Sequence, residues 1–272
     1  MYSVTERLRS YMEGRQRDII PMAEFVNLVR YLRGRITLIF GIFIFGLALG
    51  YPISGDIISW FLQANGYLPE GVELIIIQPM EVILLRLRIA TQIAIAMAFT
   101  MIIIDMSWNG SKIINKSNTE KINQKKSKIL ILFLVSLSSI GLGIIGAIYA
   151  HNILIPMLLD FLANDASNVG LTNTWQLQSW LGFVIGLFFG SIMSFQTPLV
   201  TLLLLRTGII SRSSLTENRG LIWFFALLLG AVLSPPDPIS MFLVGGPIVL
   251  LLEVALLIDK FFTTSLKFRV IK

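Results

Sequence analysis

Few side chains in this sequence have the chemistry to form a site, and most of them interrupt long apolar runs. Gln196 lies in the middle of the uncharged run 180–205, and Glu253 lies inside the run 241–258. A polar side chain at such a position is costly inside a membrane, so each one marks a candidate site that faces protein or water. Gln196 could make a structural hydrogen bond between helices or a functional contact. Glu253 could act in function or clamp two helices, with Gln196 as one candidate partner.

Pro198 adds a second polar feature beside Gln196. Proline lacks a backbone N–H, and at this position it leaves the carbonyl oxygen of Ser194 without its helical donor. We therefore expect this half of the run to be kinked and locally polar.

Other ionisable side chains near the apolar runs have ordinary structural explanations. Arg86 and Arg88 lie in the outer half of the second run, where long cationic side chains are expected to snorkel to the interface. His151 is expected to be an interfacial polar residue, because no second ionisable group shares its helix face. Asp237 lies in a proline-rich turn, where local chemistry alone indicates a structural role.

Several classes of chemistry have no carrier in the sequence. There are no cysteines and one histidine, so disulfides, thiolate chemistry and a multi-histidine metal cage are excluded within one chain. We find no phosphate-binding glycine loop, no metal-ligand spacing and no pairing of a nucleophile with a base. The sequence therefore predicts no enzymatic activity, no cofactor and no metal site.

The elements that must position the polar residues are long apolar segments. The chain has 272 residues, of which 55% are hydrophobic and only 14% charged, and its mean hydropathy is +0.77. A soluble protein carries about 25% charged residues, so this composition indicates an integral membrane protein. The runs lack the alternation of barrel strands and predict an all-α membrane protein with six transmembrane helices. They cover residues 36–54, 79–104, 129–150, 180–205, 221–233 and 241–258.

Lysine and arginine residues are confined to alternate loops. They are dense before residue 36, between 112 and 128, between 206 and 219, and from 260 onward, whereas the other loops carry none. Because basic residues stay on the cytoplasmic side, both termini are expected to be cytoplasmic. The net charge of +6 then reflects membrane topology, and no nucleic acid partner is expected. The expected parts are a cytoplasmic tail 1–35, a six-helix transmembrane domain 36–260 and a cytoplasmic tail 261–272.

The last two predicted helices are short. The run 221–233 rises only about 20 Å, well below a hydrocarbon thickness of about 30 Å. Either the membrane thins around these helices, or the proline-rich turn between them lies below the surface and is screened by neighbouring helices. Alternatively, Gly220 and Trp223 extend the span into the interface.

Several motifs, in order and at matching spacing, resemble the TatC family of the twin-arginine protein translocase. The resemblance covers most of the chain, from about Leu32 to the end of the sixth run. Its strongest part is Phe195-Gln196-Thr197-Pro198, which is similar to the family's signature of an aromatic residue, Glu or Gln, any residue and Pro in the fourth helix. Further matches are Ser234-Pro235-Pro236-Asp237 in the external turn, Pro247 with Glu253 in the last helix, Leu32-Arg33-Gly34-Arg35 before the first run and Pro79-Met80-Glu81 at the start of the second.

The resemblance implies a receptor and core scaffold for moving folded proteins across a membrane, driven by the proton-motive force. The implied partners are precursors with twin-arginine signal peptides, TatA/TatB-like single-span subunits, the lipid bilayer and further copies of this chain as a homo-oligomer. The single-span subunits would dock along the fourth to sixth helices, where Gln196, Pro198 and Glu253 would face the groove. The implied location is the cytoplasmic membrane of a prokaryote or, less commonly, an organellar inner membrane.

In the family, conserved glutamates of the N-terminal tail and the first cytoplasmic loop bind the twin-arginine signal. Here Tyr31 stands where one glutamate is usual, and Lys126-Ser127-Lys128 stands where another is expected. Two adjacent arginines are best recognised by carboxylates through forked, charge-assisted hydrogen bonds, which a tyrosine does not supply. Glu24 or Glu120 could take over, or Tyr31 could contribute a cation-π contact. The candidate signal-binding residues are Glu24, Tyr31, Arg33, Arg35 and Glu120.

A small-solute or ion transporter is the alternative from another class, with Gln196, Glu253, Arg86 and Arg88 along a central pathway. Such proteins often show two related halves, or broken helices at matching positions. We see no counterpart of either C-terminal motif in the first half of the chain, which favours the translocase.

Overall fold

The computed structural model describes residues 22–64, 66–69, 71–114, 124–168, 170, 174–207, 210–233 and 238–270. These residues are almost entirely helical, which confirms the expected all-α class. Within them, five helical stretches are long and apolar enough to cross a membrane, and a sixth, Arg219–Ala231, is shorter. The five are Val29–Gln63, Glu81–Trp108, Leu130–Asn168, Leu177–Arg206 and Met241–Phe261.

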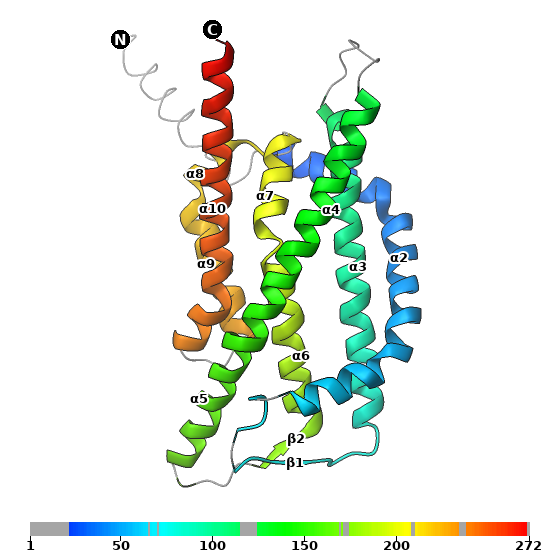
Figure 1. The fold of residues 1–272 in the computed structure, drawn as a ribbon, viewed down its shortest axis with the longest axis vertical. Coiled ribbons are helices and arrows are strands. Elements are labelled where there is room, and N and C mark those ends of the chain that lie inside the picture. Colours follow the sequence, from blue (N-terminus) through cyan, green and yellow to red (C-terminus); the bar gives the residue numbers. More distant parts are fainter. Residues whose placement is uncertain are drawn as a thin grey trace, which may run out of the picture.

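Helix α2 (Met22–Gln63) and helix α3 (Glu81–Ile114) form a pair on one side of the bundle (Figure 1). Their backbones approach closely at small residues. A Cβ atom at Gly46 would lie 2.6 Å from Cα of Ala94, and one at Gly50 would lie 2.8 Å from Cα of Ala90. Such contacts are usual between membrane helices, because small residues let the backbones pack.

The third predicted span is one long helix with an irregular turn. Helix α4 (Gln124–Tyr149) continues through a π-helical turn, η1 (Ala150–Leu154), into α5 (Ile155–Asn168). Figure 1 shows this helix crossing the bundle obliquely. A π turn holds an extra residue and redirects the side chains around it. Here the turn contains His151.

The fourth span is broken where Pro198 predicts it. Two residues separate the end of α6 (Leu177–Ser194) from the start of α7 (Thr197–Arg206), so the helix is interrupted just before Pro198. The Thr197 hydroxyl donates to the Ser194 carbonyl at 2.6 Å. The carbonyl that loses its helical donor to Pro198 is therefore satisfied by a side chain.

The last part of the chain consists of a short helix α8 (Arg212–Glu217) and a hairpin of α9 (Arg219–Leu233) and α10 (Pro238–Val270). The prediction of two short final helices is right for α9, with 15 residues, and wrong for α10, with 33 residues. The apolar run bounds only the part of α10 suited to the membrane. The helix itself continues through the polar residues beyond, because its hydrogen bonds are made by the backbone.

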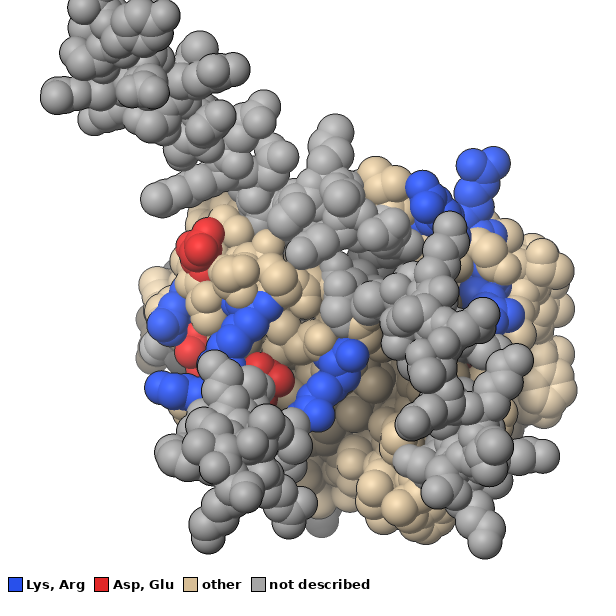
Figure 2. Space-filling model, turned by 90° about the horizontal axis from the view of Figure 1, so that it is seen from above, with Lys and Arg blue, Asp and Glu red and all other residues tan. Residues whose placement is uncertain are grey.

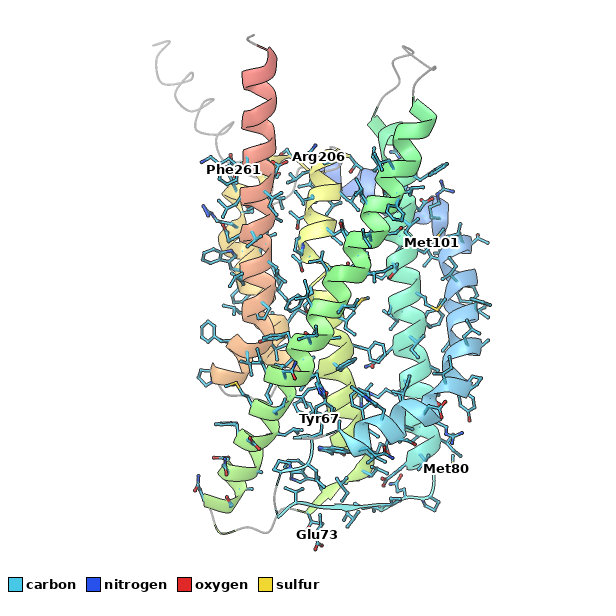
Figure 3. All side chains as sticks on the ribbon, in the orientation of Figure 1. Tyr67, Glu73, Met80, Met101, Arg206 and Phe261 are labelled. Carbon is cyan, nitrogen blue, oxygen red and sulfur yellow. The ribbon has the colours of Figure 1, made fainter. Side chains whose placement is uncertain are left out.

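The two ends of the bundle differ. Met22 and Val270, the first and last described residues, lie at one end, which we call the terminal end (Figure 1). At the opposite end, the sheet end, strand β1 (Glu73–Ile75) pairs in parallel with β2 (Thr174–Gln176). The main buried apolar cluster joins α2, α3, η1, α5 and α6, and Tyr67, which belongs to it, lies toward the sheet end (Figure 3). Elsewhere many large apolar side chains are exposed over the helices, as expected of a surface that faces lipid.

Candidate functional site

Gln196 joins the fourth span to the third. Its side chain is buried, with 6% exposure. Its Nε2 donates to the backbone carbonyl of Ser139 at 2.9 Å, and its Oε1 accepts from the Ser139 hydroxyl at 3.1 Å. The amide packs beside Gly143, where a Cβ atom would lie 3.4 Å from Nε2. Of the alternatives for Gln196, the structure shows a hydrogen bond between helices.

An apolar groove of about 710 Å³ lies between α10 and the bend of the fourth span. Tyr149 donates its hydroxyl proton to the Leu243 carbonyl at 2.7 Å and links α4 to α10 beside the groove. Gln196 is not among the lining residues, although its neighbour Phe195 is. The lining consists of Tyr149, Phe195, Pro238, Phe242, Leu243, Gly246, Pro247, Leu250 and Leu251.

Glu253 faces helix α9, and its described contacts do not include Gln196. Its Oε2 lies 3.3 Å from Arg219 Nη1, and its Oε1 accepts from Trp223 Nε1 at 3.2 Å. Its side chain keeps 29% exposure. Glu253 therefore clamps α10 to α9, and the two polar residues predicted for one groove belong to separate contacts.

Arg212 makes a second link to α10 near the terminal end. Its Nη1 lies 2.9 Å from Asp259 Oδ2, and its Nη2 donates to the Leu256 carbonyl at 3.2 Å. Figure 2 views the terminal end and shows basic side chains on both sides of this face, with acidic side chains among those on the left. This end therefore carries charged side chains of both signs, some of them paired.

Tyr31 and Arg35, two of the predicted signal-binding residues, meet a carboxylate that sequence reasoning missed. The Tyr31 hydroxyl donates to Asp105 Oδ2, and Arg35 Nε lies 3.0 Å from the same oxygen. The Asp105 side chain is 11% exposed, and that of Arg35 is 38% exposed. The four-residue spacing of Tyr31 and Arg35 puts both on the face of α2 that meets α3. A carboxylate thus lies at this face, although position 31 is a tyrosine.

The position of Asp105 in the sequence could have identified it as a candidate site residue. It directly follows the second apolar run, at the end that the loop charges assign to the cytoplasm. A carboxylate at this end is expected to form ion pairs with basic side chains at the same end of a neighbouring helix. The pairing itself depends on the register between α2 and α3, which the sequence does not reveal.

The other predicted residues of this region are only partly placed. Arg33 is exposed on α2. Glu24 lies in α2, and Lys126 and Lys128 lie in α4, but their side chains are outside the described part of the structure. Residues wholly outside the described ranges are Glu120 and the external-turn residues Pro235, Pro236 and Asp237.

Glu81 is a fully buried carboxylate at the sheet end, with 0% exposure. Its Oε1 accepts from the backbone N–H groups of Ile77 and Gln78, each at 2.9 Å, and from Gln176 Nε2 at 2.8 Å. Its Oε2 accepts from the backbone N–H of Gln178 at 3.3 Å. One carboxylate therefore ties the start of α3 to β2 and the start of α6.

Tyr67 is a second buried polar residue at the sheet end, with 1% exposure. Its hydroxyl oxygen lies 2.9 Å from His151 Nδ1, and its carbonyl accepts from Trp180 Nε1 at 3.1 Å. Burial raises the pKa of the Tyr67 phenol to about 12, so it stays protonated at neutral pH. His151, placed in the π turn, finds its polar partner on a different segment of the chain and not on its own helix.

Arg86 and Arg88 lie against neighbouring helices. Arg88 Cζ lies 3.1 Å from the position of a Cβ atom at Gly182 in α6. Arg86 Nη2 lies 3.5 Å from the corresponding position at Gly55 in α2. Arg88 remains exposed and Arg86 is half-buried, so the snorkelling of both side chains to the interface stays a prediction.

Many of the described polar side chains form hydrogen bonds or ion pairs between helices. In the described part of the chain, no three His, Asp or Glu side chains gather in a way that could hold a metal ion. The terminal end combines a carboxylate with exposed basic residues, and the groove beside α10 has an apolar lining. These features suit recognition of peptide segments and of other helices.

A family model described as "Sec-independent protein translocase protein (TatC)" matches residues 27–247. The Sec-independent protein translocase protein TatC of Escherichia coli K12 is 32% identical over 138 residues, which cover 51% of this chain and 53% of the relative. That of Haemophilus influenzae is 33% identical over 117 residues, covering 43% of this chain and 45% of the relative. The chain thus spans about half the length of these curated relatives.

Two further comparisons cover more of the chain. The TatC protein of Listeria innocua is 23% identical over 233 residues, covering 86% of this chain and 90% of the relative. A crystal structure of the twin-arginine translocase receptor TatC superimposes with a TM-score of 0.64 at 21% identity, covering 85% of this chain and 98% of that one. The fold of this chain is therefore like that of the crystallised receptor.

Proposed function

Since the chain belongs to the TatC family, we propose that it is the multi-span component of a twin-arginine, Sec-independent protein translocase. It binds twin-arginine signal peptides and serves as the core scaffold for moving folded proteins, driven by the proton-motive force. The family match over residues 27–247 carries this proposal, and the likeness of fold supports it. The chain performs no catalytic step of its own and uses no cofactor. The comparisons do not favour the transporter alternative.

The proposed topology has six spans with both termini in the cytoplasm, as the alternation of basic loops predicts. Helix α9 supplies the fifth of these spans, although its 15 residues rise only about 22 Å. The bilayer is then locally thin beside α9. In this orientation the terminal end faces the cytoplasm of a prokaryotic cell, and residues 1–35 and 261–272 form the cytoplasmic tails around the transmembrane domain 36–260.

The proposed signal-binding site is the terminal end of α2 and α3. Asp105 supplies a carboxylate where the family's glutamate position carries Tyr31, and the Tyr31 hydroxyl orients it. An incoming arginine takes the place of Arg35, whose side chain is partly exposed and can move aside. The second arginine of the signal requires a further carboxylate, for which Glu24 and Glu120 remain the candidates. Arg33 is exposed on the same helix, α2.

The proposed docking surface for single-span subunits is the apolar groove beside α10. Its volume of about 710 Å³ and its apolar lining suit the side chains of a membrane helix. Gln196 and Pro198 shape this surface by holding the bend behind Phe195. Glu253 does not line the groove and holds α9 in place through Arg219 and Trp223.

The test of the receptor role is a pull-down of the detergent-purified protein with two signal peptides, one bearing Arg-Arg and one bearing Lys-Lys. Selective binding of the Arg-Arg peptide is expected. Asp105→Asn is expected to weaken it about tenfold or more, because hydrogen bonds to charged groups contribute about 1.5 to 3 kcal/mol. Asp259→Asn is the matched control, because Asp259 also pairs with a partly exposed arginine at this end and its side chain is also 11% exposed.

Each outcome has a separate meaning. Equal binding of both peptides, in the presence of the single-span subunits, would remove the receptor role. Selective binding that Asp105→Asn leaves unchanged would keep the receptor role and remove Asp105 from the site. Equal effects of Asp105→Asn and Asp259→Asn would indicate a general loss of structure at the terminal end.

A further inference from the structure

The short segment 76–80 joins strand β1 to helix α3 at the sheet end, and its apolar side chains are largely exposed. Ile76 and Ile77 are each 62% exposed, and Met80 is 57% exposed. No ionisable residue lies between Glu73 and Glu81 in the sequence. The segment therefore presents apolar surface outside the five long helical stretches, and the proposed translocase role does not use it.

Hydrogen bonds hold this segment against the first turn of α3. The backbone N–H groups of Ile77 and Gln78 donate to the Glu81 carboxylate, each at 2.9 Å. The Glu81 N–H donates in turn to the Gln78 carbonyl at 3.2 Å, and Pro79 has no N–H to satisfy. Unpaired backbone groups are costly in a membrane. Because these groups are already paired, the segment can leave water at low cost although it is not helical.

The length of α3 sets the depth of this segment. From Glu81 to Asp105, which lies at the terminal end, the helix rises at most about 36 Å. The hydrocarbon core of a bilayer is about 30 Å thick, and the whole bilayer with its headgroup layers is about 40 to 45 Å thick. Glu81 and Asp105 therefore fit in the two opposite interfacial layers. The segment 76–80, held to Glu81, fits in the layer at the sheet end.

The apolar surface of the segment continues along α3. The Met80 carbonyl accepts from the N–H of Leu84 at 3.0 Å, so Met80 begins the first helical turn. Met80, Leu84 and Leu87 then share one face of the helix, and all three side chains are exposed. This face belongs to a helix that is long and apolar enough to cross a membrane, so lipid surrounds it.

We propose that the segment 76–80 lies in the interfacial layer of the leaflet at the sheet end, with Ile76, Ile77 and Met80 against the lipid. A lipid surface fits better than a second copy of the chain, because the exposed surface passes without a break into a helix face that lipid covers. Through the Glu81 carboxylate, the immersed segment is also fixed to β2 and to the start of α6, so the small sheet is anchored at the membrane surface. This inference does not depend on the proposed translocase function.

The test uses single-cysteine variants, because the chain has no cysteine. A nitroxide label at Ile77→Cys or Met80→Cys is measured in phospholipid nanodiscs that hold one copy of the full-length protein. Power saturation gives the collision rates of the label with O₂, which concentrates in lipid, and with Ni(II)EDDA, which stays in water. Leu87→Cys is the reference for lipid. Glu73→Cys is the reference for water, because Glu73 is exposed and lies farther from the terminal end than Met80 (Figure 3).

The labels at residues 77 and 80 are expected to lose most of the Ni(II)EDDA collisions found at residue 73, and to keep O₂ collisions close to those at residue 87. Ni(II)EDDA collisions as frequent as at residue 73 would overturn the proposal, because the segment would then lie in water. If these collisions disappeared only in nanodiscs with two copies, an interface between copies would replace the lipid. Loss of collisions with both reagents would also overturn it, because protein would then cover the segment. If either variant does not fold, Ile76→Cys takes its place.

Discussion

Replacing Gln196 by leucine tests how the third and fourth spans are held together. The substitution keeps a similar volume but removes both hydrogen bonds to Ser139, of 2.9 and 3.1 Å. A hydrogen bond between membrane helices contributes about 0.6 kcal/mol on average, so the loss of two gives about 1.2 kcal/mol. For a chain of this size, each kcal/mol shifts Tm by about 2 to 4 °C. We therefore expect Tm to fall by about 2 to 5 °C.

Thermal unfolding of the detergent-purified protein, followed by tryptophan fluorescence, measures this change. Ser194→Ala is the matched control, because the Ser194 hydroxyl bonds only to the Gly190 carbonyl of its own helix among the contacts described. It is expected to leave Tm almost unchanged. The reasoning is refuted if Gln196→Leu is as stable as the wild type, or if Ser194→Ala lowers Tm by the same amount.

Three further substitutions test other contacts. Gly230→Ala is expected to destabilise the α9–α10 hairpin by about 1 to 3 kcal/mol in denaturant unfolding, because the new methyl group meets the backbone of α10; an equal effect of Gly246→Ala, where a Cβ meets nothing within 4 Å, would contradict this. Glu253→Gln is expected to cost less than about 1 kcal/mol in the same assay, since the pair is partly exposed, and a loss of several kcal/mol would refute it. In the wild type, the pKa of the Tyr67 phenol is about 12 in the folded protein and 10.0 when unperturbed. The contribution of the neutral phenol to folding stability is therefore complete below pH 10 and is lost as pH rises toward 12, and Tyr67→Phe removes this pH dependence. Tm measured from pH 8 to 11.5 should therefore fall more steeply for the wild type than for Tyr67→Phe, and parallel curves would contradict it.

The helical class, the positions of the apolar helices and the break before Pro198 could be predicted from the sequence. Each of these depends on local features: the length of an uncharged run, or the missing N–H of a proline. The length of α10 was predicted wrongly, because hydropathy reports where a helix meets lipid and not where its backbone hydrogen bonds end. The shortness of α9 was predicted correctly, because the apolar run 221–233 has nearly the same bounds as the helix.

The contacts of the polar residues could not be predicted, because they depend on helix register and on rotation. Glu253 pairs with Arg219 and not with Gln196, a choice set by which face of α10 meets α9. Asp105 was overlooked because its partners, Tyr31 and Arg35, are remote in sequence. The Arg88 side chain, which projects from α3, packs against α6 at Gly182, where a larger residue would meet the guanidinium.

Export of a folded reporter protein tests the translocase assignment most directly. The gene is expressed, with single-span subunits from the same source, in a bacterium that lacks its own TatC. The reporter carries either an Arg-Arg or a Lys-Lys signal, and its folded form is measured outside the cytoplasmic membrane. Export of the Arg-Arg form alone is expected, and it should stop when the proton-motive force is collapsed. Failure to export either form with all subunits present in the membrane, or equal export of both, would contradict the assignment.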